Sequence, residues 1–133
     1  MKTNYLIILI ALLTINAGMN AQIISQYVET DSGTSPKGIE VWNNTDNAID
    51  FSVTNLVVEK GVNGGTPSED VTVDSGVLGS DEVMIIGSSD MQTVATDNNV
   101  LFVQKPFTFN GNDALVVKLD GVITDVFGTS GDD

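Results

Sequence analysis

Residues 109–128, with the sequence FNGNDALVVKLDGVITDVFG, carry the clearest structural signal in the chain. Asp120 and Gly121 form a favoured two-residue hairpin turn, because both central positions of a type I′ turn need a positive φ. The flanks are rich in Val, Leu and Ile, which favour strands. The stretch therefore predicts a β-hairpin in which Leu119 faces Val122.

The register of this hairpin predicts its two faces. It places Val117 opposite Thr124, and alternation along each strand then gathers an apolar set on the core side. That set comprises Leu115, Val117, Leu119, Val122 and Val126. On the opposite face Lys118 and Asp125 lie diagonally, close enough for a surface ion pair worth under about 1 kcal/mol.

Short apolar runs continue through the rest of the chain. They are rich in Val, Ile, Thr and Phe and are separated by Gly, Asn, Asp and Ser, a pattern typical of all-β domains. Besides the hairpin, the expected strands are residues 23–28, 38–42, 48–53, 56–59, 71–74, 82–86 and 100–103. Many short antiparallel strands usually pack as two sheets, so we predict an Ig-like antiparallel β-sandwich.

Three segments carry finer expectations. In residues 48–53, alternation predicts that Ile49, Phe51 and Val53 share one side. Residues 60–70 are expected to form a flexible loop around two adjacent glycines. Ser89 is expected to N-cap a short helix. The residues that this helix would bury are Met91, Val94 and Ala95.

The first 21 residues have the pattern of a secretory signal peptide. Lys2 provides a positive start, residues 5–15 are apolar but too short to span a bilayer, and small residues precede a cleavage site after Ala21. We therefore expect an exported, extracellular domain at residues 22–133, with no further membrane span. The chain has no Cys, so this domain must rely on its core without disulfides.

Composition excludes several functions. The chain has 18 acidic and 5 basic residues, a formal net charge of −13, and neither His nor Cys. A surface with this excess of negative charge repels anionic membranes and nucleic acid. We therefore expect no binding of nucleic acid through direct charge contacts. Nucleophilic catalysis by a Ser-His or Cys-His pair is impossible, and so is zinc ligation by His or Cys. We predict no enzyme activity and no catalytic residue.

Two Asp-Ser-Gly triplets resemble the catalytic loops of aspartic proteases. They begin at Asp31 and Asp74. A pair of such loops from two lobes would let two carboxylates share a proton. The triplets are too close in sequence for two lobes, and Asp-Ser-Gly is also ordinary turn chemistry. We favour turns.

Polar loops suggest two kinds of ligand. Asn110, Asn112 and Asp113 are weak candidates for calcium, because calcium takes oxygen ligands, but no loop has the alternating spacing of a dedicated site. We expect no cofactor, with calcium left open. An aromatic platform for sugars is a further candidate, although burial is favoured for its tryptophan; its residues would be Trp42, Tyr27 and Phe107. Asn43 begins a glycosylation pattern that is also a turn pattern.

Five segments in this order resemble a known family. They are ISQYVE (24–29), KGIEVWN (37–43), AIDFSVTNLVV (48–58), SGVLGSDEVMIIGSS (75–89) and the hairpin segment above. Together they resemble the lamin-tail-like domain of secreted bacterial proteins, an Ig-like sandwich. The resemblance implies structural roles, as caps, turns and buried pairs, for Lys37, Glu40, Asn43, Asn110, Gly111, Asp113 and Asp125. At Gln26 the family's usual acid is replaced.

The resemblance also implies a function. Such domains are accessory modules of extracellular proteins, often beside nucleases, phosphatases or C-terminal sorting domains. We therefore predict a non-catalytic interaction or tethering module whose partner is an extracellular protein or glycan. One alternative is the N-terminal accessory domain of a larger secreted hydrolase with its catalytic part beyond Asp133. Another is a calcium-dependent carbohydrate-binding module. The ending GTSGDD resembles the start of a further segment, which leaves open that the C-terminal closing strand of the sandwich is missing from residues 22–133.

Overall fold

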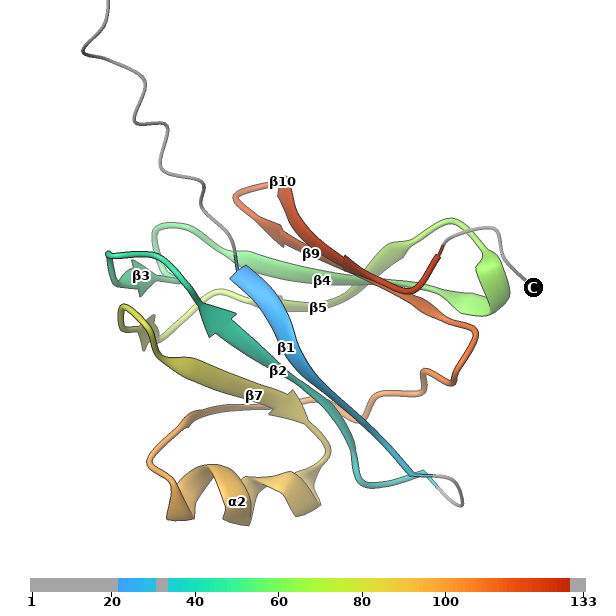
Figure 1. The fold of residues 1–133 in the computed structure, drawn as a ribbon, viewed down its shortest axis with the longest axis horizontal. Coiled ribbons are helices and arrows are strands. Elements are labelled where there is room, and N and C mark those ends of the chain that lie inside the picture. Colours follow the sequence, from blue (N-terminus) through green and yellow to red (C-terminus); the bar gives the residue numbers. More distant parts are fainter. Residues whose placement is uncertain (1–21, 31–33, 130–133) are drawn as a thin grey trace, which may run out of the picture.

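The computed structural model describes residues 22–30 and 34–129, and they form an all-β sandwich (Figure 1). The first sheet has the strand order β1-β2-β7-β8. Its strands are β1 (Gln22–Glu29), β2 (Lys37–Asn43), β7 (Val83–Gly87) and β8 (Leu101–Gln104). The predicted signal peptide and the triplet at Asp31 lie outside the described residues.

The second sheet has the order β10-β9-β4-β5 and is antiparallel throughout. Its strands are β4 (Leu56–Gly61), β5 (Ser68–Val73), β9 (Ala114–Leu119) and β10 (Val122–Phe127). A small ladder pairs β3 (Ile49–Asp50) with β6 (Val77–Leu78). The predicted fold class, an all-β sandwich consistent with an Ig-like fold, is confirmed.

The core lies between the two sheets, as alternation along the strands predicts. From the first sheet it takes Ile39, Val41, Met84 and Ile86; from the second it takes Leu56, Val58, Leu115 and Val117. Phe51 and Phe109 fill the space beside them and are at most 1% exposed. Burial of each such side chain contributes about 1.5–3 kcal/mol.

A crossover connects β7 to β8, which run parallel. Parallel neighbours cannot be joined by a tight turn, so the chain passes through a short 3₁₀ helix, η2 (Ser89–Met91), and α2 (Gln92–Asp97). Figure 1 shows α2 beside β7 on the outside of the sandwich. Ala95 is buried as predicted, but Val94 is 56% exposed. Ser89 is not the cap either, since η2 starts after Ser88 and α2 after Met91, without a side-chain cap bond.

The predicted hairpin is present, with a change in its register. Asp120 and Gly121 form the turn, with φ of 49° and 76°, and Leu119 faces Val122. Beyond Ile123 the pairing shifts by one residue, so Val117 faces Asp125 rather than Thr124. This β-bulge turns the remaining side chains of β10.

Two predictions about the hairpin are wrong. Val122 and Val126 are 66% and 50% exposed, so they are not core residues. Lys118 does not pair with Asp125, because its Nζ lies 2.5 Å from the carboxylate of Glu59 on β4. Glu59 is within reach because β9 lies between β10 and β4.

Other boundaries also differ from expectation. Residues 48–53 form a two-residue strand followed by a turn, so Val53 points away from the core and is 80% exposed. The expected loop at residues 60–70 contains the short helix η1 (Val62–Gly64) and the start of β5. The strand β6 was not predicted, because two residues are too short for a periodic signal.

Candidate functional site

A groove of about 520 Å³ lies on the outer face of the first sheet, beside the η2–α2 crossover. Strands β1 and β2, β7 and the crossover all contribute to its lining. The lining residues are Gln26, Val28, Pro36, Glu40, Ile85, Asp90, Met91 and Val94. Five of these are apolar and two are acidic, and none is a lysine. Its size is within the range of small-ligand and peptide pockets.

The strand register explains which residues of the sheet line the groove. Gln26, Glu40 and Ile85 are direct neighbours across β1, β2 and β7, so their side chains share the outer face. Ile85 is only 8% exposed although it faces away from the core. Because η2 and α2 stand over this part of the sheet, they shield Ile85 and provide one wall.

Met91 joins the crossover to the sheet over a pair of glycines. Gly38 and Gly87 face each other across β2 and β7. A Cβ on either glycine would lie 2.5 or 2.6 Å from the sulfur of Met91. Two residues without side chains therefore form the recess that lets the η2 turn approach the sheet. This close approach places Met91 in the lining of the groove.

Two carboxylates flank the apolar floor. Glu40 accepts hydrogen bonds from Ser25 Oγ at 2.7 Å and from Gln26 Nε2 at 3.3 Å. The hydroxyls of Ser88 and Ser35 hold the pKa of Asp90 below its usual range. Asp90 is therefore ionised at neutral pH.

The lysines of the described chain are engaged elsewhere. Lys105 pairs with Asp70 at 2.9 Å and Lys118 with Glu59, while Lys60 donates to Thr108 Oγ1 at 2.5 Å. The fourth, Lys37, points into the core side of β2. No lysine lines the groove, so the carboxylates of Glu40 and Asp90 have no cationic partner there.

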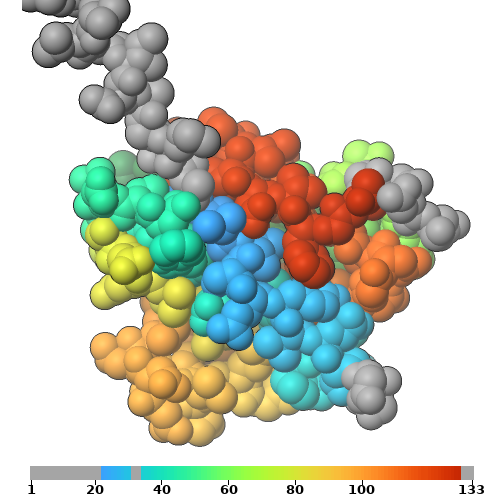
Figure 2. Space-filling model, in the orientation of Figure 1, coloured from blue at the N-terminus to red at the C-terminus, as the bar shows by residue number. Residues whose placement is uncertain are grey.

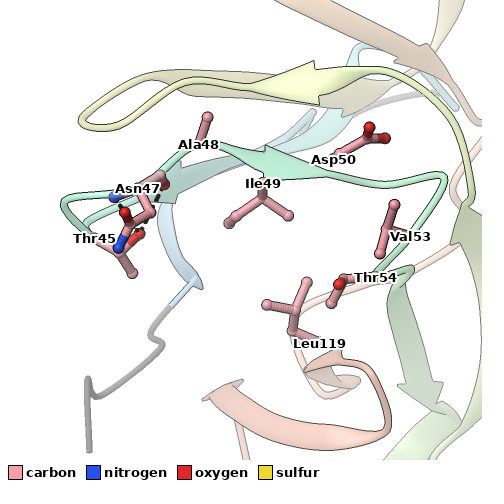
Figure 3. Close-up of a pocket in the computed structure, with 8 residues that line it drawn as sticks. All are labelled: Thr45, Asn47, Ala48, Ile49, Asp50, Val53, Thr54 and Leu119. Carbon is pink, nitrogen blue, oxygen red and sulfur yellow. Dashed lines mark hydrogen bonds between the residues drawn. The ribbon is translucent and has the colours of Figure 1, made fainter. Parts of the chain in front are cut away.

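A second hollow, of about 360 Å³, lies at one end of the sandwich (Figure 3). Ile49 and Leu119 point toward each other across it, and Val53 and Thr54 stand at its side. Several of its polar groups already have partners: Thr45 Oγ1 donates to Asn43 Oδ1 at 2.7 Å. Asp50 accepts from Ser52, which holds the pKa of Asp50 low. Few polar groups remain to orient a ligand there.

Lys37 is buried and contacts groups on β1 and on the segment before β9. It is 8% exposed, and its Nζ lies 3.3 Å from Glu29 and donates to the backbone oxygen of Phe109. The same ammonium lies 5.7 Å from the Phe109 ring centroid. Tyr27 donates to the other oxygen of Glu29 at 2.7 Å. The cluster ties β1, β2 and the segment before β9 together.

Asn43 holds the loops at the other end of β2. Its side chain is fully buried and donates to the backbone oxygens of Asn47, Leu78 and Gly79. Its own oxygen accepts from Thr45. The Asn-Asn-Thr pattern is therefore a turn with its first amide enclosed, and a glycan on this amide would break its bonds to the loops.

Asp113 is likewise used inside the fold. Its two oxygens accept backbone N–H bonds from Asn63 at 2.8 Å and Asn110 at 3.0 Å. Asn110, Gly111 and Asn112 form the exposed turn before β9. Across residues 22–30 and 34–129, no three Asp or Glu side chains gather closely enough to hold a metal ion. The structure thus assigns Asp113 to a turn.

The three aromatic residues proposed for sugar stacking do not share a surface. Phe107 is 3% exposed. Tyr27 lies between Phe109 and Phe127, with ring centroids 4.7 Å away on each side. Trp42 is half-buried rather than enclosed, and its Nε1 donates to Asp81 at 3.0 Å. These positions argue against a common platform.

The structure also places the other residues that the sequence analysis named. Glu40 lines the groove, Asp120 and Gly121 make the hairpin turn, and Asp125 bonds to β1. Asp74, in the second Asp-Ser-Gly triplet, is exposed in the turn after β5. The groove itself was not predicted, because Asp90 and Met91 reach it only through the parallel crossover.

Comparisons with family models, with curated proteins and with solved structures find no match. The resemblance to the lamin-tail-like domain therefore stays a prediction. Among the described residues, no helix is long and apolar enough to cross a membrane.

Proposed function

We propose that this protein is a non-catalytic, exported interaction or tethering module, and that the groove is the surface to which a partner polypeptide binds. The observation that carries the proposal is the apolar lining of the groove, which is partly exposed beside the crossover and has Glu40 and Asp90 next to it. Surface grooves with this lining are typical binding sites for side chains of a partner.

The acids of the described chain support a binding role over catalysis. A catalytic pair of carboxylates needs two acids whose environments separate their pKa values. Glu29, Glu59 and Asp70 pair with lysines, and Asp113 accepts backbone N–H bonds. With neither His nor Cys in the sequence, few groups remain for acid-base or nucleophilic chemistry.

A peptide-display selection tests the proposal. A random linear peptide library is selected against the purified protein, and enriched peptides are then measured against two variants. Val94→Arg puts a bulky cation into the groove, whereas Val77→Arg makes the same change on β6, at a residue of nearly equal exposure, 57% against 56%. We expect enriched peptides to bind the wild type and Val77→Arg and to lose binding to Val94→Arg. No enrichment, or equal binding to both variants, would overturn the proposal.

A further inference from the structure

The chemistry of the groove also indicates which partner it fits. We propose that it takes a peptide segment with an apolar side chain flanked by lysine or arginine. This inference rests on the proposed function and adds the chemical class of the ligand.

The apolar part of the ligand follows from the floor. Ile85 is 8% exposed at the bottom, and Val28, Pro36, Met91 and Val94 surround it. Val94 is 56% exposed. An aliphatic side chain bound there would bury its own apolar surface and that of Val94. The recess over Gly38 and Gly87 holds the sulfur of Met91 close to the sheet. The Met91 side chain therefore forms a side of the groove instead of filling it.

The cationic part follows from the two carboxylates. Glu40 belongs to β2 and Asp90 to η2, so the acids stand on different elements around one apolar floor. No lysine among the described residues neutralises them, and the chain as a whole carries a formal charge of −13. A ligand with lysine or arginine beside its apolar residue complements this charge, whereas an acidic ligand is repelled.

A metal ion is a poorer occupant of the same place. Hard cations such as calcium take six to eight oxygen ligands. Only two carboxylates line the groove, and both already accept hydrogen bonds from Ser or Gln side chains. An ammonium or guanidinium group can bind one acid at a time, so it fits two separated carboxylates better.

Three hexapeptides test the inference. They are acetyl-Gly-Lys-Val-Leu-Lys-Gly-amide and the versions with Gln or Glu in place of both lysines. Each is titrated into the isotope-labelled protein at low salt, with binding followed by NMR shifts of groove residues. We expect the lysine peptide to bind about three- to tenfold more tightly than the glutamine peptide, and the glutamate peptide most weakly. Added salt should shrink these differences, because exposed charges are screened.

Two doubly substituted proteins provide matched controls. Glu40→Gln with Asp90→Asn removes both groove charges, whereas Asp46→Asn with Asp74→Asn removes two exposed charges outside the groove lining. The preference for lysine should vanish in the first protein and persist in the second. If the first protein fails to fold, the salt dependence of the wild type decides the same question.

The possible failures can be told apart. Equal binding of the lysine and glutamine peptides, or equal loss of preference in both substituted proteins, overturns the charged ligand while a peptide-binding groove stands. If none of the three peptides shifts groove residues and display enriches none, the proposed function falls as well. Binding that shifts only residues around the end hollow contradicts both.

Discussion

The carboxylate of Asp125 accepts a hydrogen bond of 2.8 Å from the backbone N–H of Ile24, and this bond joins the edge strands of the two sheets. Next to it, Thr124 Oγ1 donates to the backbone oxygen of Gln22 at 3.0 Å. Figure 2 shows the blue atoms of β1 beside the red atoms of β10. Because the bulge at Thr124 aims both side chains at β1, two polar groups on the edge of that strand are satisfied without a backbone ladder.

Asp125→Ala should destabilise the fold by about 1–3 kcal/mol, because it leaves the Ile24 N–H without its acceptor. Asp125→Asn keeps one acceptor oxygen and should cost less. Urea unfolding measures both. The control is Asp74→Ala, which removes an exposed acid and should change stability by under about 0.5 kcal/mol. Equal stability of Asp125→Ala and the control would show that the bond contributes nothing.

Gly38→Ala should cost about 1–3 kcal/mol through overpacking. The new methyl group would lie 2.5 Å from Met91 Sδ and 2.8 Å from the backbone oxygen of Ile86. Gly111→Ala is the matched control, since a Cβ at Gly111 meets nothing within 4 Å. Thermal unfolding of the two variants compares them directly. If Gly38→Ala is as stable as Gly111→Ala, the crossover can move away from the sheet at little cost in free energy.

Lys37→Met should destabilise by about 3 kcal/mol, because it leaves the Glu29 carboxylate and the Phe109 carbonyl without their cation. Adding Glu29→Gln should recover part of this loss. Lys60→Met is the control, because Lys60 contacts Thr108 at the surface and should matter by under about 1 kcal/mol. Chemical denaturation gives all three values. No recovery in the double variant would argue that Glu29 is not the main partner.

Stability should fall at high pH through Tyr27. Burial raises the pKa of this phenol, and the hydrogen bond and charge of Glu29 raise it further. In the unfolded chain Tyr27 ionises near pH 10, so its contribution is complete below about pH 10 and is lost as the pH rises further. Between about pH 9 and pH 11 the wild type should therefore lose more unfolding free energy than Tyr27→Phe. Equal losses in the two proteins would contradict this prediction.

Export can be tested on the secreted protein itself. If residues 1–21 are a signal peptide, the intact mass of protein recovered from the medium of a bacterial host should correspond to a chain that begins at Gln22. Replacing residues in the apolar segment 5–15 with Asp should keep the protein inside the cell. Recovery of a secreted chain that still begins at Met1 would contradict the prediction.

The fold class could be predicted because local signals agreed with the tertiary structure. The Asp120–Gly121 turn needs positive φ at both positions, and the structure has it. What the sequence could not predict is the bulge at Thr124. It is favoured by the bonds to Gln22 and Ile24, about a hundred positions away in the chain, and no local periodicity reports such partners. The core position assigned to Val126 failed for this reason, whereas Val122 precedes the bulge and is exposed on the edge strand β10.

The groove was beyond prediction for a related reason. The spacing of Met91, Val94 and Ala95 predicted a buried helical face, and Ala95 alone is fully buried. Helical periodicity cannot tell a helix packed against a sheet along its length from one that stands at the side of a groove. That difference depends on Gly38 and Gly87, which belong to two other strands.

The recess over Gly38 and Gly87 also makes the groove sensitive to oxidants. The side chain of Met91 is partly exposed, and an oxidant such as peroxide converts a methionine thioether to a sulfoxide. A sulfoxide adds a polar oxygen to a side chain whose sulfur already sits against two glycines, with no space on that side. The η2 turn would have to lift from β2 and β7, taking Asp90 with it. Chemical damage to one sulfur atom would thus reshape the wall of the groove.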